Sequence, residues 1–176
     1  MSRQVVLANI LAVFIAMSAC AQDRPPGEIR EYEGKRLDAF DRAYDNSLKG
    51  PQKVNRETYR LEITGLVEKP LSLTYQEVLA LPHIERAMTL HCVEGWSEHL
   101  LFEGVRLTNL IALAKPKSGI KTVIFHAADG DTSSLDYGFV QAKDILLAFK
   151  INGRVLDERR GFPFQVAAES KLGYKW

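Results

Sequence analysis

Cys92 is the residue with the most distinctive chemistry, and it stands in the run Thr-Leu-His-Cys-Val-Glu-Gly-Trp. A cysteine thiolate is a soft ligand that suits zinc, copper(I), iron–sulfur clusters and other soft-ligated metals. The chain has two cysteines, and the context of the other, Cys20, predicts its use in export. Cys92 is then a single thiol in an oxidising compartment, where it cannot form an internal disulfide. The sequence therefore indicates a metal ligand or a nucleophile at Cys92.

Histidines near Cys92 allow other assignments, but their positions do not favour a zinc site. If residues 86–92 form a strand, His91 and Cys92 point to opposite faces of the sheet and cannot converge on one ion. The spacing of the histidines also matches no recognised zinc motif. A Cys–His nucleophile with His99 or His126 as base remains open. A buried structural cysteine also remains open, since this is a common fate of free thiols.

The N-terminal residues predict export. Residues 5–19 are apolar and follow a single Arg3, which is the pattern of a secretory leader and too short for a membrane-spanning helix. The leader ends in Met-Ser-Ala before Cys20, which resembles a bacterial lipobox, where the cysteine receives lipid. We therefore expect residues 1–19 to be a lipoprotein signal peptide. The mature protein would be periplasmic or otherwise extracytoplasmic, tethered to a bacterial membrane through Cys20. An ordinary signal peptide cut beside Cys20 is the alternative.

The predicted mature chain is electrically neutral, which argues against nucleic-acid binding. The whole chain has 23 basic and 22 acidic residues, and the leader contains one of the basic residues and no acid. Residues 20–54 are polar and weakly periodic, so we predict a linker and an irregular arm, with a short helix near residues 37–44. Residues 55–176 have the size of one domain with its own core. Residues 173–176 are typical of a loop that enters a strand, which leaves open a C-terminal truncation of the domain.

The hydrophobic pattern predicts a strand-rich domain with short helices between the strands. Alternating and β-rich runs predict strands over 59–63, 86–92, 120–127 and 164–168. Thr74 and Glu77 have the spacing of a capping box, so a helix should run over 75–81. Two further short helices are predicted, over 107–114 and 140–146. Asn152-Gly153 predicts a tight hairpin turn. This order of elements favours a compact α+β domain over a doubly wound βαβ sheet.

Several segments, in order along the chain, resemble the sulfite-oxidase-type molybdopterin oxidoreductases. The His-Cys-Val-Glu-Gly-Trp run around Cys92 looks like the cysteine motif of that family. Gly161-Phe162-Pro163 is similar to its downstream Gly-x-Pro segment, and residues 173–175, Gly-Tyr-Lys, are similar to its cofactor-binding Gly-x-Lys. The other matching segments include 59–67, 102–107 and 146–153. The resemblance covers roughly residues 55–176. Each segment alone is a weak match, but the occurrence of all of them in the family's order is specific.

This resemblance implies the sulfite-oxidase-type fold, a mixed α+β domain with a sheet-rich core. It implies a molybdenum–molybdopterin cofactor in which Cys92 is the protein ligand of the metal and the catalytic residue. Arg160, Gly173, Tyr174 and Lys175 would help to hold the pterin. Such enzymes transfer an oxygen atom to or from a small-molecule substrate. Because the sequence has no haem or flavin motif, we also expect a separate electron-transfer partner, such as a cytochrome or a membrane haem protein.

Several positions depart from the family's pattern. Gln165 stands where related periplasmic methionine-sulfoxide reductases carry an arginine, and Arg160 stands where they carry an asparagine. A pterin-contacting threonine of the family falls at Ala127, and the N-terminal asparagine of the pterin site has only Asn46 as a candidate. We therefore leave the substrate open and keep two alternatives. One is a binding module that retains the fold without the chemistry, and the other is a cofactor-free thiol enzyme at Cys92.

Overall fold

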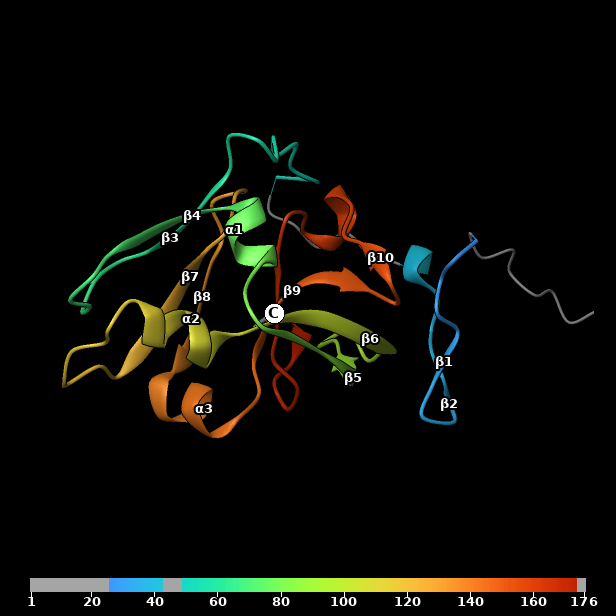
Figure 1. Ribbon diagram of the computed structural model, residues 1–176. Helices are drawn as coiled ribbons and strands as arrows, with labels where there is room; N and C mark the ends of the chain where they lie inside the picture. Colours follow the sequence, from blue (N-terminus) through green and yellow to red (C-terminus); the bar gives the residue numbers. More distant parts are fainter. Residues whose placement is uncertain (1–25, 43–48, 174–176) are drawn as a thin grey trace, which may run out of the picture.

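The computed structural model describes residues 26–42 and 49–173 of the chain. The predicted signal peptide, Cys20, Asn46, Tyr174 and Lys175 lie outside the described residues. Within the described part, the elements are one five-stranded sheet, three two-stranded hairpins, three short α-helices and two 3-10 helices (Figure 1). The second 3-10 helix, η2 (Glu158–Arg160), precedes β11. None of the helices described there has the length and apolar character that crossing a membrane requires.

An antiparallel five-stranded sheet forms the centre of the domain. Its strands are β5 (His83–His91), β6 (Ser97–Arg106), β9 (Leu146–Ile151), β10 (Arg154–Val155) and β11 (Gln165–Ala167). β6 lies between β5 and β9, and both β10 and β11 pair with the other edge of β9. A register shift occurs between Glu103 and Gly104 of β6. There β6 approaches β9 so closely that a Cβ at Gly104 would collide with the backbone of Leu147.

Two hairpins and the three helices pack on one face of this sheet (Figure 1). The hairpins are β3 (Arg60–Ile63) with β4 (Leu71–Thr74), and β7 (Thr122–His126) with β8 (Thr132–Asp136). The helices are α1 (Tyr75–Leu79), α2 (Leu107–Leu113) and α3 (Tyr137–Ala142). The buried residues on this face form what we call the helix-side cluster: Val78, Val105, Leu107, Leu110, Leu135, Val140, Ile145, Leu147, Phe149 and Ala168.

An N-terminal arm, residues 26–42, packs against the opposite face of the sheet. It contains β1 (Glu31–Tyr32), β2 (Lys35–Arg36) and a 3-10 turn, η1 (Phe40–Arg42). Phe40 is only 1% exposed. It belongs to what we call the arm-side cluster: Phe40, Met88, Leu100, Phe102, Leu146, Ala148, Ile151, Leu156 and Ala167. Residues 146–149 of β9 alternate between the two clusters, as a strand buried on both faces requires. The register shift against β6 then returns Ile151 to the arm-side cluster.

Most predicted elements occur close to their predicted places. In the capping box, the Glu77 N–H donates to the Thr74 hydroxyl at 3.2 Å, and the Thr74 N–H donates to the Glu77 carboxylate at 2.7 Å. The Asn152-Gly153 turn joins β9 to β10, and its two residues have φ values of 51° and 77°, as a type I′ turn requires. The other predicted elements that are confirmed correspond to β3, β5, α2, β7 and β11.

The helix predicted over residues 140–146 is misplaced. The Asp136 carboxylate accepts a hydrogen bond from the Phe139 N–H at 2.9 Å, so α3 begins earlier and ends at Ala142. Leu146 instead begins β9 and pairs with Arg106. Because β9 is buried on both faces, its sequence shows no apolar–polar alternation, and periodicity alone cannot assign such a run. The short helix predicted near residues 37–44 corresponds to η1, as far as the described residues reach.

Candidate functional site

Cys92 stands in the turn that joins β5 to β6. The Cys92 N–H donates to the Trp96 carbonyl at 2.9 Å, and the Gly95 N–H donates to the Cys92 carbonyl at 3.2 Å. Gly95 has a φ of 91°, a conformation that favours glycine, so this residue permits the turn. The turn presents a cysteine that is free and partly exposed.

Two side chains of the same turn interact beside the sulfur. Cys92 Sγ donates to Glu94 Oε2 at 3.8 Å, and Trp96 Nε1 donates to the same oxygen at 3.1 Å. The first bond is weak, because a thiol is a weak donor and the distance is long. A metal ion that binds a cysteine replaces the thiol proton. Metal binding would therefore break the Cys92–Glu94 contact while Trp96 still held the Glu94 carboxylate.

The structure brings Gly173 to Cys92, as a shared site requires. Leu172 forms a parallel bridge with His91, so the segment after β11 runs beside the end of β5. A Cβ at Gly173 would lie 3.6 Å from the Cα of Cys92 and 3.2 Å from Cδ2 of Leu90. Glycine thus lets the backbone pack closely here and leaves no side chain against the cysteine.

A turn after β11 directs this segment towards β5. The Lys171 N–H donates to the Ala168 carbonyl at 3.1 Å, and Ser170 has a φ of 75°. Ser170 therefore occupies the third position of a type II turn, which usually requires glycine. The Glu169 carboxylate in the same turn lies 2.9 Å from Nη2 of Arg86 in β5. The turn and this ion pair together hold the segment against the edge of β5.

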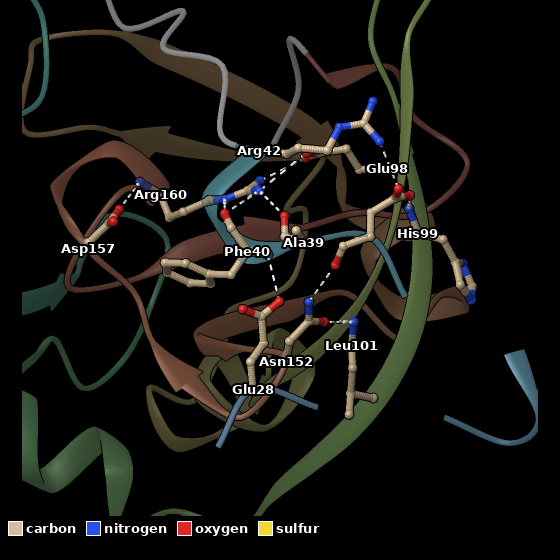
Figure 2. Close-up of polar contacts among 11 residues, drawn as sticks. Glu28, Ala39, Phe40, Arg42, Glu98, His99, Leu101, Asn152, Asp157 and Arg160 are labelled. Carbon is tan, nitrogen blue, oxygen red and sulfur yellow. Dashed lines mark hydrogen bonds and ion pairs between the residues drawn. The ribbon is translucent and has the colours of Figure 1, made fainter. Parts of the chain in front are cut away.

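Arg160, another predicted cofactor residue, is buried on the arm side. It is 7% exposed, and its Nη1 donates to Glu98 Oε2 at 2.8 Å. Its Nε and Nη2 donate to the Phe40 carbonyl at 3.0 and 2.8 Å (Figure 2). All three guanidinium nitrogens therefore donate within the protein. Glu98, which is 1% exposed, is the second residue of β6 and lies directly opposite Leu90 of β5.

The described residues offer no cluster of protein ligands for a metal ion. Among residues 26–42 and 49–173, no three histidine, cysteine, aspartate or glutamate side chains gather around one point. His91 Nδ1 lies 2.7 Å from Ser97 Oγ, and His99 Nδ1 lies 3.0 Å from Thr89 Oγ1. Both histidines thus pair with hydroxyls across the β5–β6 hairpin. A metal at the neighbouring cysteine would have to take its other ligands from elsewhere.

Two positions that depart from the family's pattern have distinct surroundings. Gln165 in β11 pairs with Ala148, and its Oε1 is buried without a hydrogen-bond partner in the described part of the chain. Buried polar atoms are almost always bonded, so a donor reaching this oxygen would be stabilised. Ala127 lies in the β7–β8 turn, where its N–H donates to the Asp131 carbonyl at 2.9 Å. The structure therefore gives this backbone a role in closing the turn.

Aromatic packing holds the Gly-x-Pro segment. The centroid of the Phe164 ring lies 5.6 Å from that of Tyr59 and 5.4 Å from that of Tyr75. Burial raises the pKa of both tyrosines, and at Tyr75 nearby positive charges partly offset the effect. Both side chains therefore stay neutral at physiological pH and act as packing groups beside β11.

Glu98 is a buried charged residue near the Cys92 turn that the sequence patterns did not identify. The available signal is a single acidic residue ahead of the apolar run Leu100-Leu101-Phe102. A carboxylate in such a strand needs a buried partner. Its partner, Arg160, lies 62 positions away and no spacing rule connects the two.

Comparisons with known proteins identify the family of the chain. The model of a family described as the oxidoreductase molybdopterin binding domain matches residues 48–176. The chain is 30% identical to the protein-methionine-sulfoxide reductase catalytic subunit MsrP of Campylobacter jejuni, over 70% of this chain and 48% of the relative. It is 35% identical to the uncharacterized oxidoreductase YuiH of Bacillus subtilis, over 61% of this chain and 54% of the relative. The chain spans about half the length of these curated relatives.

The crystal structure of the sulfane dehydrogenase SoxCD from Paracoccus pantotrophus has the same fold. It matches with a TM-score of 0.68 and 26% identity, over 72% of this chain and 38% of that chain. This confirms the predicted α+β, sheet-rich fold of the sulfite-oxidase type, and the family match confirms molybdenum–molybdopterin as the cofactor. The site fits that group, since one soft ligand at Cys92 suits a metal whose other ligands come from a cofactor. The chain belongs to the family of molybdopterin-binding oxidoreductase domains.

Proposed function

We propose that this protein transfers an oxygen atom to or from a small-molecule substrate, at a molybdenum bound by Cys92. One observation carries the proposal: a free, partly exposed thiol, with Gly173 packed beside it, in a chain of the molybdopterin-binding family. When bound, the cofactor supplies the two-electron chemistry of oxygen-atom transfer. The role of the protein is to bind the metal through one thiolate and to leave one side of the metal open to the substrate.

We also propose which residues hold the pterin. Gly173 lets the backbone approach closely, and Lys175, two residues later, supplies a cation for a phosphate group. Tyr174 lies between them in sequence. The bridge between Leu172 and His91 of β5 supports this assignment, because it directs the chain at Gly173 towards Cys92. For Arg160, whose guanidinium nitrogens already donate within the protein, the contribution that we propose is indirect.

The electron partner and the location of the protein are further parts of the proposal. Electrons pass to or from a separate cytochrome or membrane haem protein, because the sequence has no haem or flavin motif. The protein is extracytoplasmic and attached to a bacterial membrane through lipid on Cys20. Turnover by purified protein without any external electron carrier would contradict the first statement. An unmodified N-terminus downstream of Cys20 in mass spectrometry would contradict the second.

The first experiment is to measure molybdenum and pterin in full-length protein purified from a host that makes molybdopterin. We expect about one molybdenum per chain, lost or made labile by Cys92→Ser. Cys20→Ser is the matched control, because it replaces the other cysteine in the same way and should leave the molybdenum content of exported chains unchanged. Sulfoxides are the first substrates to try, since the Campylobacter relative is named for a protein methionine sulfoxide.

Other results of that experiment would select the alternatives. Correctly exported protein that contains neither molybdenum nor pterin would favour a binding module that retains the fold. Activity that needs no metal and disappears on stoichiometric labelling of Cys92 would favour a thiol enzyme.

A further inference from the structure

Segments remote in sequence support both strands of the turn that carries Cys92. On β5, Leu172 pairs with His91. On β6, the Asp38 N–H donates to the His99 carbonyl at 2.8 Å, and the His99 N–H donates to Asp38 Oδ2, also at 2.8 Å. The pairing of β9 with β6 ends before this point. The N-terminal arm therefore covers the edge of β6 that β9 leaves open.

Asn152 joins the arm to β6 where β9 ends. Its Oδ1 accepts from the Leu101 N–H at 2.9 Å, and its Nδ2 donates to the Asp38 carbonyl at 2.8 Å (Figure 2). Its backbone carbonyl accepts from the Ile29 N–H at 2.9 Å. Because Asn152 is fully buried, water cannot readily replace these bonds. One residue thus continues the hydrogen bonding of β6 after the neighbouring strand has turned away.

A buried ion pair fixes the same arm to the beginning of β6. Arg160 Nη1 lies 2.8 Å from Glu98 Oε2, and Nη2 lies 3.3 Å from Oε1. Nη2 also reaches the carbonyls of Ala39 and Phe40, at 3.5 and 2.8 Å. Figure 2 shows the guanidinium between the arm and β6. Since its bonds run to both elements, neither can move away without unpairing a buried charge.

The ion pair acts close to Cys92 in the hairpin. Glu98 lies opposite Leu90, which is two residues before Cys92, and both side chains face the arm side. We propose that Arg160 is a positioning residue: by joining Glu98 to the arm, it fixes the strands that present Cys92. This inference rests on the proposed role of Cys92 as metal ligand, but its first test needs no metal.

The test measures how fast iodoacetamide labels Cys92 in full-length protein made without molybdopterin. A Cys20→Ser background leaves Cys92 as the only thiol. Arg160→Met and Glu98→Gln each break the ion pair. Arg159→Met is the matched control, because Arg159 is half exposed and its loss removes the same charge from the same 3-10 helix, η2.

We expect Cys92 to be labelled roughly tenfold faster in Arg160→Met and in Glu98→Gln than in the Cys20→Ser parent. In Arg159→Met, Cys92 should be labelled at the parent rate. Hydrogen exchange at the backbone amide of His99 should rise with the labelling rate. Arg160→Lys keeps the charge but not the planar fork, so it should give a smaller rise. This variant keeps the test valid if Arg160→Met does not fold. Unchanged labelling in folded Glu98→Gln and Arg160→Lys would overturn the proposal.

Molybdenum retention in the loaded protein separates positioning from direct contact with the pterin. If Arg160 acts through Glu98, then Arg160→Met and Glu98→Gln lose molybdenum at similarly raised rates during dialysis. Loss from Arg160→Met alone would overturn positioning and assign Arg160 a direct contact. Failure of the proposed function looks different: the wild type would hold no molybdenum, while the labelling differences would remain.

Discussion

The helix-side and arm-side clusters lie on opposite faces of one sheet, but different interactions build them. The helix-side cluster is apolar, and the hairpins and helices around it form between residues close in sequence. A buried polar residue there, Asp129 in the β7–β8 turn, accepts a local hydrogen bond from the Asp131 N–H. The arm side also contains buried polar residues, namely Glu28, Glu98, Asn152 and Arg160. Side-chain hydrogen bonds of the last three join residues 51 to 121 positions apart. The beginning of β6, beside the Cys92 turn, is thus held by long-range polar bonds.

The two kinds of construction should respond differently to mutation. An apolar cluster loses stability with the volume removed, and the loss stays near the cavity. A buried polar network loses more when one member is removed, because its partners are left unsatisfied. The arm side should therefore be the more sensitive region, and its disturbance should reach Cys92.

The largest effect is expected for Glu98→Leu. The substitution leaves the Arg160 guanidinium buried without its carboxylate, which should lower the free energy of unfolding by about 3–5 kcal/mol. Urea unfolding measures this loss. Adding Arg160→Met removes the stranded charge and should recover most of the stability. A double variant no more stable than Glu98→Leu would contradict the idea that the ion pair acts as a unit.

The matching change on the helix side is Leu110→Ala. Leu110 is 1% exposed within the helix-side cluster, so its truncation should cost about 3 kcal/mol in urea unfolding. Leu110→Met conserves the volume and should cost less than about 1.5 kcal/mol. In contrast to the arm-side variants, Leu110→Ala should leave the labelling rate of Cys92 unchanged while the protein is folded. Faster labelling would show that the two faces are not independent.

The same contrast explains what the sequence could predict. Thr74 and Glu77 specify the start of α1, and Asn152-Gly153 specifies a hairpin, because the deciding contacts lie within a few residues. Strand β6 has no counterpart among the predicted elements, since much of it is buried on both faces and its sequence does not alternate. The pairing of Glu98 with Arg160 depends on the assembled fold, and no local pattern encodes it.

The candidate site divides in the same way. Cys92 was predicted from the chemistry of a single thiol and from a family motif, and Gly173 from a family motif alone. The structure brings their backbones together. Their roles in binding the cofactor remain predictions, as do those of Tyr174 and Lys175. The indirect role that we propose for Arg160 could not be predicted from the sequence, because only the fold shows that its guanidinium faces Glu98 and Phe40.

A smaller effect is expected for Thr74→Ala, at the start of α1. The substitution removes the hydroxyl that accepts from the Glu77 N–H, which should cost about 1 kcal/mol in urea unfolding. Thr74→Ser keeps the hydroxyl and is the control. Because this cap is local to the helix side, hydrogen exchange should rise in the first turn of α1 and not at His99 of β6. A rise at both places would contradict the separation.

The smallest effect is a pH dependence of the same cap. Hydrogen bonds from the backbone N–H of Thr74, and then from its hydroxyl, lower the pKa of the Glu77 carboxyl below its ordinary value of 4.5. A carboxylate with a lowered pKa in the folded state adds stability above its unfolded pKa and loses it as pH falls through the folded pKa. The stability difference between wild type and Glu77→Gln should therefore be constant near pH 7 and shrink below about pH 4. Because Glu77 is fully exposed, water screens the bonds and the difference should stay small. Urea midpoints of both proteins, measured from neutral pH to below about pH 4, test this prediction. A stability difference that widens in acid would show that the carboxylate is not the favoured form of Glu77 in the folded cap.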